Sequence, residues 1–268
     1  MESVTNENEI KNLENNEILG NPTLNNTIIN FIGNDNILYC ENNVKIVGST
    51  INFKGNNSLI YLSKSDSNYS LNIQIIHNST IFIGKDNNIV PSLNINAQEH
   101  KNVIIGDDCS FLSNVAIRTT DAHSFYNANS KKRINYSNSV YIGDHVFLGH
   151  NSYIEKGVKI GSGSIIDNNS HVPSNHSLPS NYLFSGNPIK VLEKNVFFVK
   201  DYPASYNAEA TKDSKDYISN VYLFSNNPEE SLDLEKIDLI LSNFSVLEKI
   251  EFIQKLFIKN KRHDRFSL

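Results

Sequence analysis

An aliphatic residue recurs at every sixth position along one stretch of this sequence. The series is Ile142, Leu148, Ile154, Ile160, Ile166, Val172 and Leu178. Six residues of an α-helix leave the first and last side chains about 240° apart, so this period does not mark one face of a helix. It fits short strands joined by corners. Glycine follows the aliphatic residue at Gly143, Gly149 and Gly161, where a residue without a Cβ permits a tight turn.

Three such hexads make one triangular coil. Residues 142–159 and 160–177 then form two stacked coils, and Ile105, Phe111 and Ile117 mark a further one. Stacking buries a continuous row of aliphatic side chains that a single coil would leave in water, so neighbouring coils stabilise one another. The sequence therefore predicts an all-β solenoid with three-sided coils.

The hexads are interrupted between His123 and Ile142. His123 occupies the sixth position after Ile117, and the repeat resumes one residue out of phase. We therefore expect residues 123–139 to loop out of the solenoid. Loops that protrude from a rigid scaffold commonly carry functional side chains, and this loop begins at a histidine.

The region before residue 103 repeats more loosely. Similar apolar motifs begin at Thr27, Thr50 and Thr80, and each precedes an asparagine-rich turn. We interpret residues 23–102 as irregular N-terminal β-coils and residues 1–22 as a polar N-terminal segment. Asparagine suits coil corners because it accepts left-handed backbone angles. Codon bias in an AT-rich genome is the alternative explanation for the asparagines.

The C-terminal extension, residues 191–268, becomes helical from about residue 231. Apolar residues at helical spacing are Leu247, Ile250, Ile253, Leu256 and Phe257. Ser245 and Glu248 predict a capping box at the start of this helix. Basic residues are concentrated at the C-terminal end of this helix, namely Lys255, Lys259, Lys261, Arg262 and Arg265. We expect the helical pair to cover the end of the solenoid, with contact to a membrane surface or a partner as the alternative.

Composition excludes several classes of protein. The 268 residues carry a net charge of −5, which provides no basic field for nucleic acid. No stretch reaches the roughly twenty apolar residues of a membrane span, and the acidic start lacks the features of a secretion signal. Cys40 and Cys109 are too few for a disulfide framework or a thiolate zinc site. We therefore expect a cytoplasmic protein without a metal.

Several motifs together carry a resemblance to a known family. They are Arg118-Thr-Thr-Asp-Ala-His123, Arg133-Ile-Asn135, the run from Val140 to Gly149, and Ser185-Gly-Asn-Pro188. Over residues 103–200 the chain resembles the hexapeptide-repeat acyltransferases, and among them the bacterial sugar and capsular polysaccharide O-acetyltransferases, including the sialic acid type. The resemblance implies a left-handed parallel β-helix with its catalytic part at residues 103–190. It also implies acetyl-CoA as cosubstrate, a glycan acceptor, and a homotrimer with active sites between neighbouring prisms.

In such enzymes a histidine at the place of His123 acts as the general base. An imidazole with an ordinary pKa near ~6.5 can take the proton of a sugar hydroxyl as it attacks the thioester directly, without an acyl-enzyme. Asp121, two residues earlier, is a candidate to orient the imidazole, with an Asx corner as the equal alternative. Tyr126, Arg133 and Asn135 are candidate donors to the acceptor sugar.

The acyl donor is expected near the corners of later coils. Phe147 stands where these enzymes commonly carry tryptophan, so it offers an apolar wall without an indole N–H. A backbone N–H near Gly149 or His150 is the candidate oxyanion donor. We expect coenzyme A to lie near Asp167, Asn168 and Lys190.

The sequence leaves two other functions open. A zinc-dependent enzyme resembling the prism-shaped carbonic anhydrases would draw on His123, His145 and His150. A non-catalytic carbohydrate-binding solenoid would keep the hexads without needing a histidine at the loop root.

Overall fold

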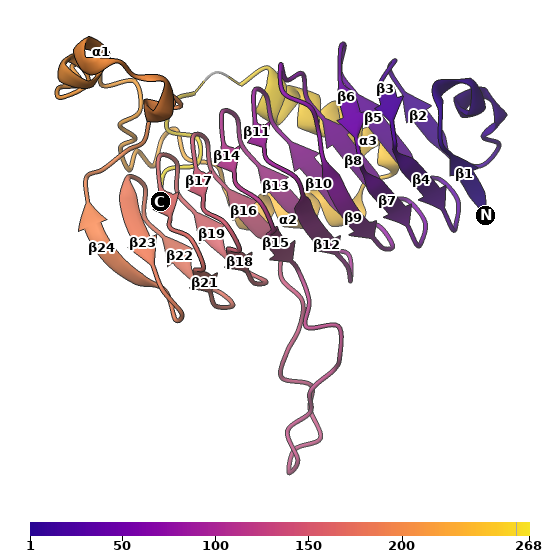
Figure 1. Cartoon of the computed structure of the whole chain (residues 1–268). Helices are drawn as coiled ribbons and strands as arrows, with labels where there is room; N and C mark the ends of the chain where they lie inside the picture. The colour runs from indigo at the N-terminus through magenta and orange to yellow at the C-terminus, as the bar shows by residue number, and fades with distance from the viewer. Residues whose placement is uncertain (261) are drawn as a thin grey trace.

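The structure is a computed structural model that describes residues 1–260 and 262–268. Lys261, one of the basic residues expected at the end of the last helix, lies outside the described residues. The chain forms a left-handed parallel β-helix with three long faces, and this confirms the predicted solenoid (Figure 1).

Each face is a sheet to which successive coils contribute one strand. The first face contains β1 (Glu2–Val4), β4 (Ile28–Phe31), β7 (Thr50–Phe53), β9 (Leu71–Ile75), β12 (Leu93–Ala97), β15 (Val115–Arg118), β18 (Tyr153–Ile154) and β21 (His171–Val172). The second face contains β2 (Glu17–Leu19), β5 (Ile37–Cys40), β8 (Leu59–Leu62), β10 (Thr80–Ile83), β13 (Val103–Ile105), β16 (Val140–Ile142), β19 (Lys159–Ile160) and β22 (Ser177–Leu178). The third face contains β11 (Asn88–Ile89), β14 (Ser110–Phe111), β17 (Phe147–Leu148), β20 (Ile165–Ile166), β23 (Tyr182–Ser185) and β24 (Lys190–Lys194). A small sheet pairs β3 (Thr23–Asn25) with β6 (Lys45–Val47).

The hexad aliphatics fill the interior, as the repeat predicted. The seven residues from Ile142 to Leu178 in that series are each at most 5% exposed. Neighbouring coils pair in parallel, with Ile105 opposite Ile142 and Ile142 opposite Ile160. The two antiparallel exceptions among the described strands are β1 with β4 and β23 with β24, at the two ends of the solenoid.

The N-terminal coils continue the sheets of the first and second faces, whereas the sheet of the third face begins at β11. Ile60 pairs with Ile81 and Ile81 with Val103, so the sheet passes without a break from residues 23–102 into the hexads. Residues 1–22 form β1, the 3-10 helix η1 (Glu7–Asn12) and β2. Asparagine supplies ten of the nineteen positive-φ positions among the described non-glycine residues, so its abundance has a structural use at the corners.

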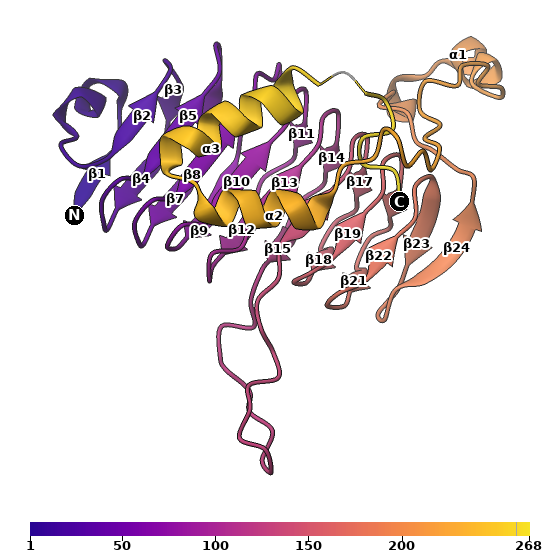
Figure 2. The same cartoon turned by 180° about the vertical axis from the view of Figure 1, so that it is seen from behind.

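The C-terminal helices lie on the second face rather than at the end of the solenoid, which corrects our expectation. Helices α2 (Leu234–Asn243) and α3 (Val246–Ile253), with the π-helical turn η3 (Gln254–Ile258), cross its strands (Figure 2). The reason is that this face presents large apolar side chains outward. These outward residues are Tyr61, Phe82, Ile104 and Tyr141, and they share a buried cluster with the helices.

The predicted capping box opens α3: Ser245 accepts from the N–H of Glu248, and Glu248 accepts from the N–H of Ser245. Arg265 is buried rather than part of an exposed basic end, since it pairs with Asp144 at 2.7 Å and with Asp107 at 2.9 Å.

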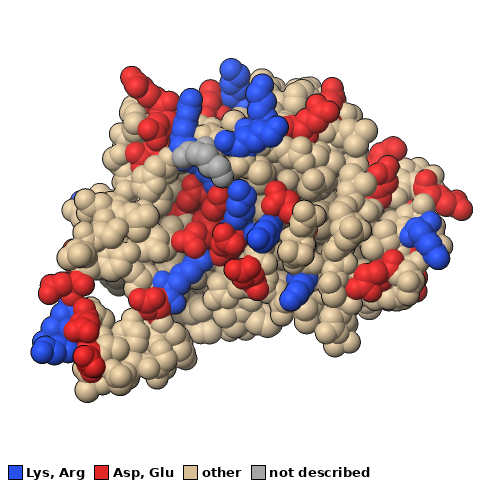
Figure 3. Space-filling model, turned by 90° about the horizontal axis from the view of Figure 1, so that it is seen from above, with Lys and Arg blue, Asp and Glu red and all other residues tan. Residues whose placement is uncertain are grey.

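A further segment between β24 and α2 folds back beside the third face. It contains the short elements η2 (Pro203–Ser205) and α1 (Ala208–Asp213). On the face seen in Figure 3, basic and acidic side chains are interspersed rather than separated into fields of one sign. No helix within residues 1–260 and 262–268 is long and apolar enough to cross a membrane.

Candidate functional site

The connection between β15 and β16, residues 119–139, projects far from the solenoid as a hairpin (Figure 1). Its two arms pair through an antiparallel bridge between Tyr126 and Arg133. The N–H of Ile134 donates to the carbonyl of Phe125 at 2.9 Å. The loop expected at residues 123–139 is therefore an ordered hairpin rather than an irregular excursion.

His123 lies at the root of this hairpin with its side chain exposed. Asn135, which is 8% exposed, fixes the backbone on both sides of it. The Asn135 side chain donates to the carbonyl of His123 at 2.8 Å and accepts from the N–H of Phe125 at 2.7 Å. Asn135 thus holds the two arms of the hairpin together, a role that the expectation of sugar binding did not include.

Asp121 belongs to a charged cluster beside the histidine. Its carboxylate accepts from Lys156 and, at 2.8 Å, from the side chain of Asn135, and Arg118 lies 3.9 Å away. Burial acts to raise the pKa of Asp121, but the hydrogen bonds from Lys156 and Asn135 outweigh it and lower that pKa below its usual value. Among the described side chains, none of the hydrogen bonds of Asp121 goes to the imidazole of His123.

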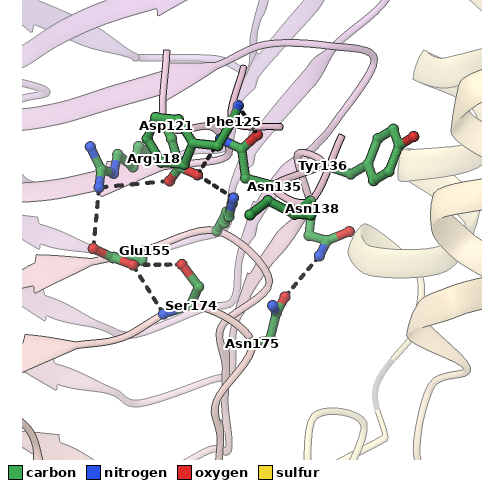
Figure 4. A pocket seen from close by; sticks show the side chains of 11 residues that line it. Arg118, Asp121, Phe125, Asn135, Tyr136, Asn138, Glu155, Ser174 and Asn175 are labelled. Atoms are coloured by element: carbon green, nitrogen blue, oxygen red, sulfur yellow. Dashed lines mark hydrogen bonds and ion pairs between the residues drawn. The ribbon is translucent and has the colours of Figure 1, made fainter. Parts of the chain in front are cut away.

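Beside the hairpin root lies an open cleft of about 720 Å³ (Figure 4). Its lining residues are Arg118, Asp121, Phe125, Ile134, Asn135, Tyr136, Asn138, Glu155, Lys156, Ser174 and Asn175. Within it Arg118 donates to Glu155 at 3.1 Å, and Glu155 also accepts from Ser174 and from His171. The cleft therefore presents ordered charges and amides with the apolar rings of the hairpin on one side.

Arg133 anchors the hairpin to the turn before β13. Its guanidinium makes two hydrogen bonds to Glu99, at 2.7 and 2.8 Å, and Ser137 donates to the same carboxylate. Hydrogen bonds from Arg133 and Ser137 lower the pKa of Glu99 to about 2. Tyr126, by contrast, is 61% exposed on the hairpin.

The residues expected near the acyl donor lie on the third face and its corner with the first face. Phe147 points outward from β17, half-buried, with its ring centroid 5.5 Å from that of Phe198. At Gly149 a Cβ atom would come within 2.5 Å of the backbone nitrogen of Asn168, so glycine allows adjacent coils to approach closely. His150 is exposed, and its Nδ1 lies 2.6 Å from Ser113 Oγ.

Both backbone N–H groups considered for the oxyanion already have acceptors in the chain. Gly149 donates to the carbonyl of Ile166 at 2.8 Å, and His150 donates to the Asn168 side chain at 2.7 Å. The first bond belongs to the sheet ladder and the second closes the corner. Each of the two groups therefore has an acceptor within the chain.

Asp167 and Asn168 form the equivalent corner of the next coil. Asp167 accepts from the N–H of Asn168 at 2.7 Å and from Ser185 Oγ at 3.2 Å. Lys190 begins β24 with an exposed side chain. All of these positions lie along the edge between the third and first faces, or beyond β23 on the third face.

His123 lies on a different edge of the prism. The hairpin leaves after β15 on the first face and returns to β16 on the second, whereas Gly149, Asp167 and Asn168 follow strands of the third face. The width of the first face therefore separates the two groups of expected site residues within one chain.

Comparison with known proteins agrees with this architecture. A family model described as bacterial transferase hexapeptide (six repeats) matches residues 139–174. The polySia-specific acetyltransferase NeuO is 28% identical with a TM-score of 0.64, covering 75% of this chain and 93% of its own. The polysialic acid O-acetyltransferase OatWY is 28% identical with a TM-score of 0.65, covering 76% and 97%. No curated protein matches significantly.

The chain is a hexapeptide-repeat acyltransferase. Its repeat, its fold and the protruding hairpin at the expected place agree with one another. The histidines named for the zinc alternative are not brought together in the acyltransferase chain. His145 is buried between the rings of Phe198 and Tyr222, and its two nitrogens contact Asp108 and the carbonyl of Phe198. Within the described residues, no group of three or more histidine, cysteine, aspartate or glutamate side chains could hold a metal ion.

The cleft beside the hairpin root also contains residues for which the sequence predicted no role. Lys156, 5% exposed, and Glu155 connect the hairpin root to the next two coils. The sequence did contain a hint of a special role for Glu155, because this residue follows an aliphatic residue at a position where the neighbouring hexads have glycine. Arg118 begins the motif that ends at His123, and the sequence predicted no role for it. In the structure it bridges Asp121 and Glu155.

Proposed function

We propose that this acyltransferase moves an acetyl group from acetyl-CoA to a hydroxyl of a bacterial surface glycan, with His123 as general base. The observation that carries the proposal is the similarity to two polysialic acid O-acetyltransferases over three quarters of the chain. An exposed histidine at the root of the hairpin, beside a polar cleft, supports it. We further propose that the reaction takes place in the cytoplasm.

His123 supplies the proton chemistry in this proposal. A sugar hydroxyl is a poor nucleophile near neutral pH, and an adjacent imidazole can accept its proton as the oxygen attacks the thioester carbonyl. The same imidazolium can then protonate the departing thiolate. Direct transfer needs no cysteine, and both thiols are unsuited to act as nucleophiles because Cys40 and Cys109 are buried and burial raises the pKa of each.

A homotrimer is part of the proposal. His123 and the corner residues expected to contact coenzyme A, namely Asp167 and Asn168, lie on different edges of one prism, so they can meet when the edge of one subunit faces another subunit. The hairpin also exposes large apolar side chains that water does not favour. These are Phe125, Tyr126, Ile134 and Tyr136, each at least 50% exposed. Contact with a neighbouring subunit would bury them.

The roles of the remaining expected residues follow from this arrangement. Phe147 would provide an apolar wall for the thioester end of the donor, and the exposed Lys190 would face its phosphates. Asn135 and Arg133 would act mainly by holding the hairpin, because their polar groups are occupied by the chain itself. Tyr126 remains available to the acceptor or to a neighbouring subunit.

The proposal is tested by acetyl transfer from acetyl-CoA to polysialic acid, followed by mass spectrometry of the product. Removing a general base typically costs 10²–10⁴-fold in rate, so we expect His123→Ala to lower kcat by roughly that factor. His100→Ala is the matched control, because His100 is also exposed and sits in the neighbouring turn. Equal activity of wild type and His123→Ala, with both proteins folded and trimeric by light scattering, would refute the assigned base.

A further inference from the structure

The outward surface of the first face carries a column of amide side chains. Asn52 on β7 lies opposite Gln74 on β9, Gln74 lies opposite Asn96 on β12, and Asn96 lies opposite Arg118 on β15. Neighbouring strands are about 4.8 Å apart, so the column presents one polar side chain per strand at a regular interval. Its last member, Arg118, also lines the cleft beside the hairpin.

Each member of this amide column keeps an N–H donor available. The oxygen of Asn52 accepts from Asn30, that of Gln74 accepts from Lys54, and that of Asn96 accepts from Gln98. In the part of the chain that the structure describes, their NH₂ groups have no acceptor. Arg118, at the end of the column, directs its guanidinium to Glu155 at 3.1 Å.

A second column beside it shapes a shallow hollow. Asn72 pairs with Asn94, Asn94 with Ala116, and Ala116 with Tyr153. The small side chain of Ala116 leaves a notch between an amide and the Tyr153 ring, over which Arg118 lies at 4.8 Å. The resulting pocket of about 360 Å³ includes members of both columns.

This face differs from the other two in what covers it. The helices α2 and α3 cover the second face (Figure 2). Phe198 packs on the third face beside Phe147. The first face runs along the lower edge in Figure 1, the edge from which the hairpin descends. Its amide side chains from Asn52 to Asn96 are partly or fully exposed.

We propose that the first face between Asn52 and Arg118 is an extended subsite for a linear glycan, which it leads toward the cleft at the hairpin root. This proposal rests on the proposed function and identifies the acceptor as a polymer. Amide and guanidinium N–H groups suit the hydroxyl, ring and carboxylate oxygens of sugars, and an aromatic ring beside a notch suits the apolar side of a sugar ring. A protein partner would instead call for a core of large apolar side chains, which these columns lack apart from Tyr153.

Kinetics with short and long acceptors tests the extended subsite. The variants Gln74→Ala and Asn96→Ala each remove one side-chain amide donor from the column, and the loss of one hydrogen bond weakens binding about fivefold. We expect KM for a long polysialic acid oligomer to rise about fivefold in each variant and further in the double variant. KM for a short oligomer, KM for acetyl-CoA and kcat should stay unchanged.

Two further variants sharpen the test. Asn88→Ala is the matched control, because it removes an exposed asparagine from the third face, and all KM values should remain at the wild-type level. Ala116→Phe fills the notch, so it should weaken the long acceptor without changing KM for acetyl-CoA. Equal long-acceptor kinetics in wild type and the Gln74→Ala/Asn96→Ala double variant would overturn the proposal, as would an equal loss in Asn88→Ala.

Direct binding separates this proposal from the proposed function. Titration of the oligomer without acetyl-CoA measures the subsite even if no acetyl transfer is found. Binding that is weakened in the double variant, in a protein without transferase activity, would leave the subsite standing and refute the function. Transfer to short and long acceptors with the same KM would leave the function standing and refute the subsite.

Discussion

Lys249 on α3 offers a quantitative test of how the C-terminal helices are held. Its side chain is fully buried, and its Nζ contacts the carbonyls of Asn57 and Asn78 at 2.7 and 3.1 Å and the Asn78 side-chain oxygen at 2.6 Å. In the described part of the chain, no carboxylate pairs with it. Burial therefore lowers the pKa of Lys249 from 10.5 to about 7.

The sign of the pH dependence follows from this lowered pKa. Between about pH 7 and pH 10.5 the unfolded chain keeps the lysine protonated while the folded chain has released that proton. Stability therefore rises with pH in this range, by at most about 1.4 kcal/mol per pH unit. With the two pKa values above, the contribution of Lys249 to the free energy of unfolding grows by about 2 kcal/mol between roughly pH 7 and pH 9.

Replacing Lys249 with methionine removes this titration while keeping a long side chain. Urea unfolding at a series of pH values measures the free energy of unfolding of both proteins. Between about pH 7 and pH 9, that of wild type should rise by about 2 kcal/mol relative to that of Lys249→Met. Lys255→Met, on the exposed side of the following turn, is the control for loss of a positive charge. Parallel stability curves for wild type and Lys249→Met would show that the buried lysine does not release its proton near neutral pH.

Two further predictions concern the hairpin and the donor wall. Glu99→Gln removes the charge that holds Arg133, so trypsin should cleave the hairpin several times faster than in wild type. An unchanged cleavage rate in limited proteolysis would show that Asn135 holds the hairpin without that ion pair. Phe147→Ala removes the proposed apolar wall, so kcat/KM for acetyl-CoA should fall about tenfold, equivalent to about 1.4 kcal/mol, with little change in Tm. Unchanged kinetics would remove Phe147 from the site.

The repeat was readable from the sequence because each hexad is a local signal. Ile105, Ile142 and Ile160 occupy the same inward position in successive coils, and in the structure they are paired on neighbouring strands. The loop was readable for the same reason, as an interruption of that period after Ile117. The position of the C-terminal helices could not be predicted in this way. The second face on which they pack is formed by residues such as Tyr61 and Phe82, which are far away in the sequence.

The polar partners of the expected site residues could not be predicted from local sequence patterns either. Arg133 was expected to meet a sugar, and in the structure it is bound to Glu99. Asp121 was a candidate either to orient the histidine or to form an Asx corner, and its hydrogen bonds go to Lys156 and Asn135. Charged and amide groups take whichever partner the fold brings within reach, and a spacing in the sequence does not specify that partner.

The sequence by itself determined that this chain winds into a three-sided solenoid and that a histidine stands where the winding is interrupted. It could do so because the period of six and its break are properties of neighbouring residues. The tertiary structure alone decided that the histidine and the donor corners lie on separate edges, and that amides from separate coils align on one open face. These relations depend on the stacking of coils, which places residues about twenty positions apart side by side.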